Sequence, residues 1–109
     1  MLFPHFGNIV INSKTKIGCN CNILQGVTIG NTKGRNGGTP IIGNNVYIGP
    51  NAVVVGNIRI GDNVLIAGNS FINFSIPQNH IAIGNPAKII HRENATAEYI
   101  NNPYTDQSI

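Results

Sequence analysis

Charged residues are scarce in this sequence, and acidic residues are the scarcest. Only 10% of the 109 residues are charged, and seven Lys and Arg outweigh four acidic residues to give a net charge of +3. Such a small excess, scattered along the chain and without interleaved aromatic residues, does not indicate a protein that binds nucleic acid. It would suit a ligand that carries phosphate, and it is equally compatible with an ordinary protein surface.

Cysteine and histidine are too sparse to predict a metal site. The two cysteines, Cys19 and Cys21, lie two residues apart, where a disulfide between them would be badly strained. No second group of Cys or His residues completes the spacing of a metal site. We therefore expect a protein that needs no metal and whose thiols are structural.

Long apolar runs are absent as well. No stretch is long or apolar enough to span a bilayer, so we expect no insertion into a membrane. The first eight residues, MLFPHFGN, lack the basic and apolar pattern of a secretory signal peptide. We therefore expect a cytoplasmic protein, and its length fits one domain.

What the sequence does contain is an aliphatic residue at every sixth position. The series is interrupted once and then resumes: Ile11, Ile17, Ile23, Ile29, Ile42, Ile48, Val54, Ile60, Ile66 and Ile72. The residue four positions later is small or apolar: Thr15, Cys21, Val27, Val46, Ala52, Ile58, Val64, Ser70 and Ile76. A short fixed period is the signature of a solenoid, and a hexapeptide period indicates a parallel β-helix.

We interpret each hexapeptide as one short strand followed by a corner. The aliphatic residue and the residue four later point inward, and Gly or Asn at the corners tolerates positive φ. The asparagines expected at corners are Asn12, Asn22, Asn44, Asn45, Asn63 and Asn69. Three hexapeptides close a triangular coil of about eighteen residues, and successive coils stack at about 4.8 Å. The predicted fold is an all-β, single-stranded parallel β-helix with the shape of a triangular prism.

Two other folds fit the pattern less well. A β-sandwich would show a period of two with turns every eight to twelve residues or so, whereas this chain keeps a period of six. An α-helical fold is excluded because Gly and Asn are too frequent and no three-to-four-residue apolar spacing persists.

The repeats divide the chain into a prism, residues 1–90, and a short polar C-terminal tail, residues 91–109. We expect the tail to cap the open end of the prism, with a short helix at about 93–100, because an uncapped prism exposes strand edges. The period breaks in a polar, Gly-rich segment at 31–40, where we expect a projecting loop. Loops that interrupt a rigid repeat often carry function, although a tolerated insertion would give the same break.

Several segments resemble the hexapeptide-repeat acyltransferase superfamily. They are PHFGNIVIN, ILQGVTIGNT, GNNVYIGPNAVVVGNIRIGDNVLIAGNS and GNPAKII, and together they cover about residues 3–90. Within the superfamily the chain is most similar to serine acetyltransferases and to sugar O-acetyltransferases of surface-polysaccharide clusters. The resemblance implies a left-handed coil, despite the general preference for right-handed crossovers. It also implies a homotrimer with sites between neighbouring prisms.

His5 matches the catalytic histidine of serine acetyltransferases, in which an Asp-His pair precedes a GIV strand. A neutral imidazole within about 3 Å of an acceptor hydroxyl would take its proton as the oxygen attacks the thioester, for a gain of about 10² to 10⁴. Pro4 replaces the Asp here, and Gly38 and Thr39 stand where that family has an Arg and a second His that help to hold serine. An N-terminal surface histidine is the alternative interpretation of His5.

The resemblance also implies that coenzyme A lies in a groove between two prisms, held mainly by backbone groups. The matching positions are Gly30, Asn31, Thr32, Gly49, Pro50, Ala67 and Gly68. Lys88, together with Arg92, is the candidate partner of the phosphates. Corner geometry alone would also explain the glycines. Of the other histidines, we expect His80 to be structural and His91 to lie in the exposed tail.

These features favour an enzyme that transfers an acetyl group from acetyl-CoA, as co-substrate, to a hydroxyl of a sugar. Serine O-acetylation is the alternative, because the same resemblance covers it. A non-catalytic β-helix scaffold is a further alternative, although Thr is too sparse for the regular ladders of an ice-binding face. A zinc carbonic anhydrase of this fold needs three His ligands, and His5, His80 and His91 are wrongly placed for that role.

Overall fold

The computed structural model describes residues 8–32 and 37–99 of the chain. Its strands are short, as a hexapeptide repeat requires. They are β1 (Val10–Ile11), β2 (Lys16–Ile17), β3 (Asn22–Ile23), β4 (Thr28–Gly30), β5 (Ile41–Ile42), β6 (Tyr47–Ile48), β7 (Val53–Val55), β8 (Arg59–Ile60), β9 (Val64–Ile66), β10 (Phe71–Ile72), β11 (His80–Gly84) and β12 (Ala87–His91). Within these described ranges, no helix is long and apolar enough to cross a membrane.

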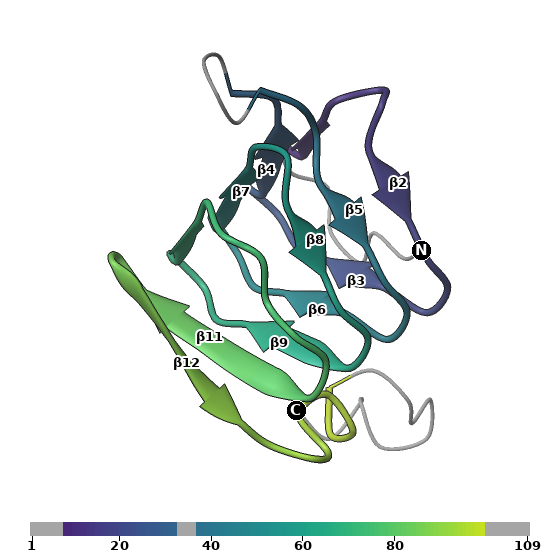
Figure 1. The fold of residues 1–109 in the computed structure, drawn as a ribbon, viewed down its shortest axis with the longest axis vertical. Coiled ribbons are helices and arrows are strands. Elements are labelled where there is room, and N and C mark those ends of the chain that lie inside the picture. Colours follow the sequence, from purple (N-terminus) through teal and green to yellow (C-terminus); the bar gives the residue numbers. More distant parts are fainter. Residues whose placement is uncertain (1–7, 33–36, 100–109) are drawn as a thin grey trace.

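The strands stack into three sheets that form the faces of a triangular prism (Figure 1). The β4–β7 face has the strand order β1-β4-β7-β10, the β6–β9 face β12-β11-β9-β6-β3, and the β5–β8 face β2-β5-β8. Through the first three coils, every third strand returns to the same face one coil further on, which confirms the predicted β-helix. The final strand departs from this rule, because β12 turns back and pairs with β11 antiparallel.

The register shows where the coils differ in length. Ile11 lies opposite Ile29, which is the regular spacing of three hexapeptides. Ile17, by contrast, lies opposite Ile42, so the second coil holds seven extra residues, which fall in the 31–40 segment. The fourth coil is shorter than the regular one by two residues, because Ile66 lies opposite Ala82.

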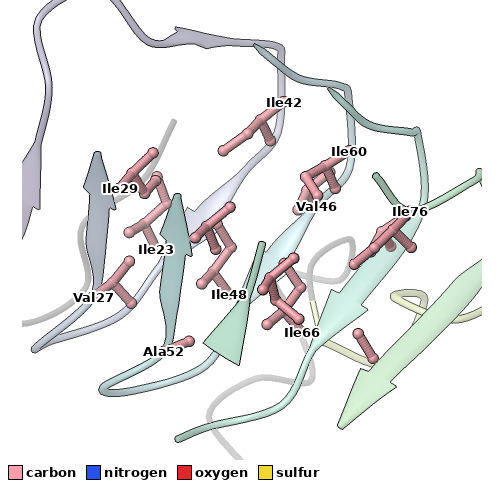
Figure 2. Packing of buried hydrophobic residues seen from close by; sticks show 14 of the residues in the cluster. Ile23, Val27, Ile29, Ile42, Val46, Ile48, Ala52, Ile60, Ile66 and Ile76 are labelled. Carbon is pink, nitrogen blue, oxygen red and sulfur yellow. The ribbon is translucent and has the colours of Figure 1, made fainter. Parts of the chain in front are cut away.

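The inward positions predicted from the sequence form the core. From Cys21 onward, the described side chains at these positions are at most 6% exposed. Each packs against the equivalent residue of the next coil, and Figure 2 shows Ile42, Ile60 and Ile76 in one such row. Ile11 and Ile17 are only half-buried, because the first coil has no coil above it among the described residues.

Asparagine shapes the corners, but only in part at the predicted positions. Asn45, Asn63 and Asn69 have positive φ as expected, and so do Asn20, Asn51 and Asn79, which the pattern had not singled out. Among the described residues, Asn12, Asn22 and Asn44 do not share this conformation. Asn22 lies in strand β3, so its predicted corner position is wrong. The side chains of Asn12 and Asn44 accept the N–H groups of Lys14 and Cys19 (2.9 and 2.8 Å). These side-chain bonds stabilise a corner without requiring a left-handed backbone.

The described part of the tail forms a strap along the β6–β9 face. Residues 93–99 form turns, so the helix expected there is not present. The amide of Asn63 donates to the Glu93 carbonyl (2.6 Å) and accepts from the Thr96 hydroxyl (2.7 Å). Further along, the ring of Tyr99 contacts that of Tyr47, with centroids 4.9 Å apart. The Tyr99 carbonyl also accepts from Asn22 in the first coil (3.2 Å), so the strap spans the prism.

Removing a core side chain from a middle coil should weaken the whole stack. Ile48 is fully buried, so Ile48→Ala should lower the free energy of unfolding by about 2–5 kcal/mol, because the neighbouring coils cannot close the cavity. Denaturant titration followed by circular dichroism measures this loss. Val10→Ala is the control, because Val10 is 58% exposed and its truncation should cost under about 0.5 kcal/mol. Equal losses would contradict the stacked core.

Candidate active site

The catalytic candidate His5 lies outside the described residues, and its role stays a prediction from the sequence. The first described residue is Asn8, two residues before β1. The structure does place the other candidates, and it divides them between two corners of the prism.

One group, Gly49, Pro50, Ala67 and Gly68, stacks at the corner between the β6–β9 face and the β4–β7 face. Gly49 N–H donates to the Ile66 carbonyl (2.8 Å), and Asn69 N–H donates to the Pro50 carbonyl (2.9 Å). A Cβ on Gly49 would lie only 2.5 Å from the backbone nitrogen of Gly68. Packing between coils therefore accounts for Gly49, whatever ligand approaches this corner.

Lys88 extends this corner group. Ala67 N–H donates to the Ala82 carbonyl of β11 (2.9 Å), and on β12 Lys88 lies opposite Ile83. Its side chain is exposed, and it makes no ion pair within the described part of the chain. Arg92 lies four residues further along, or about 13 Å in an extended strand. The structure therefore brings Lys88 to the corner and leaves Arg92 at the far end of the hairpin.

The second group, Gly30, Asn31 and Thr32, closes the base of the 31–40 segment at the end of β4. Asn31 Oδ1 accepts the Gly38 N–H (2.8 Å), and Thr32 and Gly38 form an antiparallel bridge. Among residues 8–32 and 37–99, a Cβ on Gly30 would meet nothing closer than Val55 Cγ1 at 4.0 Å. The described residues leave room for a side chain at Gly30, so their packing does not explain this glycine.

Both groups border the β4–β7 face, one from each side. β7 runs between them, because it follows the Gly49 corner and ends at Val55, opposite Gly30. An extended ligand lying along this face would therefore meet backbone groups at both corners. That shape fits a long molecule such as coenzyme A.

Gly38 occupies a position that a larger residue could not fill without strain. Its φ is +142°, in the region that favours glycine. A Cβ there would also lie 3.0 Å from the Cβ of Asn57, on the neighbouring coil. The backbone of this segment therefore does not suit an Arg at position 38.

The thiols and the described histidines do not form a catalytic or metal-binding cluster. Cys21 is buried and its Sγ donates to the Gly43 carbonyl (3.2 Å), and burial raises the pKa of this thiol, so it stays protonated near neutral pH. His80 Nδ1 lies 2.8 Å from the Gln78 carbonyl, and His91 Nε2 lies 3.0 Å from Glu93 Oε2. Across residues 8–32 and 37–99, no three His, Cys, Asp or Glu side chains gather as metal ligands would.

A groove that the sequence analysis did not anticipate lies on the β5–β8 face. It has a volume of about 650 Å³ and is lined by Ile41, Gly43, Arg59, Ile60, Gly61, Asp62, Ser75, Ile76, Pro77 and Gln78. In the sequence, this groove is marked only by the spacing of Ile76. Ile76 lies opposite Ile60, whereas a regular coil would place Gln78 there, so this coil is two residues short. A shortened coil next to a Pro marks a place where regular strand pairing ends.

Comparison with known proteins agrees with this geometry. The family model "Bacterial transferase hexapeptide (six repeats)" matches residues 39–73. Serine acetyltransferase 1, chloroplastic, of Arabidopsis thaliana is 40% identical over 91 residues, which are 83% of this chain and 29% of the relative. A protein of Escherichia coli K12 named for colanic acid biosynthesis, the acetyltransferase WcaB, is 38% identical over 81 residues, which are 74% of this chain and 50% of the relative.

Solved structures are similar at the same level. Serine acetyltransferase of Neisseria gonorrhoeae in complex with serine matches with a TM-score of 0.73 and 38% identity, over 80% of this chain and 36% of that one. Soybean serine acetyltransferase complexed with serine matches with a TM-score of 0.74 and 38% identity, over 82% and 37%. The chain thus spans half or less of these relatives. It belongs to the hexapeptide-repeat acyltransferase superfamily, and its prism is the left-handed parallel β-helix of that superfamily.

The two corner glycines should respond differently to the same substitution. Gly49→Ala should lower the free energy of unfolding by about 1–3 kcal/mol, because its Cβ would press on the backbone of the next coil. Gly30→Ala should leave stability nearly unchanged, because no other described residue fills the space. Thermal or denaturant unfolding of the two variants measures the difference. A large loss for Gly30→Ala would show that its glycine serves packing after all.

Proposed function

We propose that this chain is an acetyl-CoA-dependent O-acetyltransferase whose acceptor is a hydroxyl of a sugar. The observation that carries the proposal is the pair of small-residue corners on the two sides of the β4–β7 face. Gly30 in particular borders a space that no other described residue fills. The similarity to acetyltransferases supports the same activity.

Backbone groups and small side chains would hold the co-substrate along this face. Gly30, Asn31 and Thr32 would contact it at one corner, and the Gly49 to Gly68 group would contact it at the other. The Lys88 ammonium, which is exposed beyond the Gly49 corner, would pair with a phosphate. Holding both substrates in one orientation is itself a large part of such catalysis.

In this proposal His5 acts as a general base. Its neutral imidazole takes the proton of the acceptor hydroxyl while the hydroxyl oxygen attacks the thioester carbonyl, and it returns the proton to the departing thiolate. A backbone N–H, in the Gly-rich segment 31–40, would stabilise the negative charge that develops on the carbonyl oxygen. Direct attack of the hydroxyl on the thioester needs no covalent intermediate on a cysteine, and Cys21, which is buried and protonated, is not available as a nucleophile.

A sugar acceptor is favoured over serine by the loop residues. Serine carries a carboxylate and an ammonium group, and burying the carboxylate unpaired would cost several kcal/mol. Gly38 has no side chain to pair with it, and its backbone conformation fits glycine. Thr39 supplies a hydroxyl, which suits hydrogen bonds to a sugar. Serine remains the second candidate, since some relatives are named for serine and others for colanic acid biosynthesis.

We further propose that three chains of 11.6 kDa assemble into a homotrimer. The two corner groups lie on the outside of a convex prism, so one chain offers only one wall of a site. A second prism would supply the opposite wall and enclose the co-substrate. Acetyl transfer would then take place between neighbouring chains.

The role of His5 can be separated from binding. His5→Ala should lower kcat by about 10² or more, because the hydroxyl then lacks its base. The affinity for acetyl-CoA, measured by calorimetry, should stay near that of the wild type. His91→Ala is the control, because His91 is exposed on β12 and should be silent in turnover. A His5→Ala variant that keeps most of its activity would contradict the proposal.

The choice of acceptor has a direct test. We expect acetyl transfer to sugar hydroxyls and weak or undetectable transfer to free L-serine, with kcat/KM for serine below about 10⁴ M⁻¹s⁻¹. Mass spectrometry of products from acetyl-CoA, across a panel of amino acids and nucleotide-linked sugars, measures both. A higher value for serine would mean that the substitutions at Gly38 and Thr39 do not exclude it. Transfer to no member of the panel would favour a non-catalytic scaffold.

A further inference from the structure

The groove on the β5–β8 face runs over the second, third and fourth coils and includes the place where regular strand pairing ends. Arg59 N–H donates to the hydroxyl oxygen of Ser75 (3.0 Å) rather than to a backbone carbonyl. Ile76 N–H then donates to the Arg59 carbonyl (3.0 Å), as an isolated bridge. Pro77 follows and has no N–H to continue the ladder. Regular strand pairing therefore ends at β8, and Ile76 alone bridges it, with its carbonyl accepting the Gly61 N–H (2.9 Å).

The lining of this groove combines apolar side chains with a few polar groups. Ile41 and Pro77 contribute exposed apolar surface, and Ser75 and Gln78 contribute hydrogen-bonding groups. The side chains of Ile60 and Ile76 point into the core and offer the groove only their backbone. Its volume of about 650 Å³ lies within the usual range of small-molecule sites, about 300–1,000 Å³. Free serine would occupy a small part of such a volume, whereas a sugar with an attached group would fill more of it.

Two opposite charges border the groove without pairing. Arg59 is exposed, and within residues 8–32 and 37–99 it makes no ion pair. Asp62 follows Arg59 by three residues, so the Cα atoms of the two residues are at most about 11 Å apart. One oxygen of Asp62 accepts the Asn44 N–H (2.7 Å), and a carboxylate can accept further bonds. The planar fork of Arg59 suits a carboxylate or phosphate, and Asp62, Ser75 and Gln78 suit hydroxyls.

We infer that this groove binds the acceptor, and that the acceptor is a sugar carrying an anionic group. The apolar side chains meet the C–H face of the ring, the polar groups bond its hydroxyls, and Arg59 pairs with the anion. The anion is either a carboxylate on the ring or a phosphate linked to it. This inference rests on the proposed function, because it names the substrate class of that activity.

The position of the groove agrees with an acceptor role. Ile41 lies opposite Arg59 in the ladder and follows Thr39 by two residues. The groove therefore continues from the segment to which the resemblance assigns acceptor-holding residues. Because the Gly49 corner lies opposite the β5–β8 face of the same prism, an acceptor in the groove would meet acetyl-CoA that the corresponding corner of a neighbouring prism holds in the proposed trimer.

Binding without turnover tests the inference directly. Calorimetry on the full chain would compare glucuronate, UDP-glucose, glucose and inorganic phosphate. We expect at least one of the two anionic sugars to bind at least about tenfold more tightly than glucose or phosphate, as a charge-assisted hydrogen bond allows. Tight binding of glucuronate alone identifies a ring carboxylate, and tight binding of UDP-glucose alone identifies a linked phosphate. Binding of neither, or equal binding of phosphate, overturns the inference.

Variants tie this binding to the groove. Arg59→Gln should reduce the affinity for the anionic sugar to that for glucose, and Gln78→Ala should weaken all sugars by a smaller factor. Lys14→Gln is the matched control, because Lys14 is an exposed cation in the first coil and not in the groove. Sedimentation velocity would verify that each variant keeps the wild-type assembly. Unchanged affinity in Arg59→Gln overturns the inference, whereas acetyl transfer to sugars in the same variant would leave the proposed function standing.

Discussion

The structure depends on inward side chains stacking on their equivalents one coil away. Ile48 lies opposite Ile66, and Ile66 opposite Ala82, so each core residue has a neighbour in a fixed position. This contact holds the inside of every coil to the same triangular outline. The corners are under no such constraint, because a corner can gain or lose residues while the strands on both sides keep their partners. Variation, and with it any binding site, is therefore confined to corners and outer surfaces.

That same constraint explains what the sequence could and could not predict. Core residues such as Ile48 were predictable because their contacts repeat with the chain's own period. The strap was not, because it depends on single contacts, Asn63 with Thr96 and Tyr47 with Tyr99, that occur once. The antiparallel turn-back of β12 was missed for the same reason. A period carries no information about contacts that do not repeat.

Glycine shows the limit most clearly at the candidate site. In the sequence, Gly30 and Gly49 are equivalent, since each follows an inward Ile. In the structure their surroundings differ, because Gly49 faces the backbone of the next coil, whereas no described residue comes closer than 4.0 Å to a Cβ placed on Gly30. Corner packing therefore explains Gly49 alone. The candidate cofactor residues could be listed from the sequence. Only the contacts with the neighbouring coil show which of these glycines packing requires and which it does not.

Both changes in coil length fall at one corner, between the β4–β7 face and the β5–β8 face. The seven extra residues of the second coil precede β5, and the two residues that the fourth coil lacks would precede Ile76. The regular third coil lies between them, and its Asn57 packs against Gly38 of the longer coil. Gly30 and the groove with Arg59 both adjoin this corner. The repeat thus departs from its period at the corner where the second coil is lengthened and where the β5–β8 face loses its regular pairing, and both places border the proposed binding surfaces.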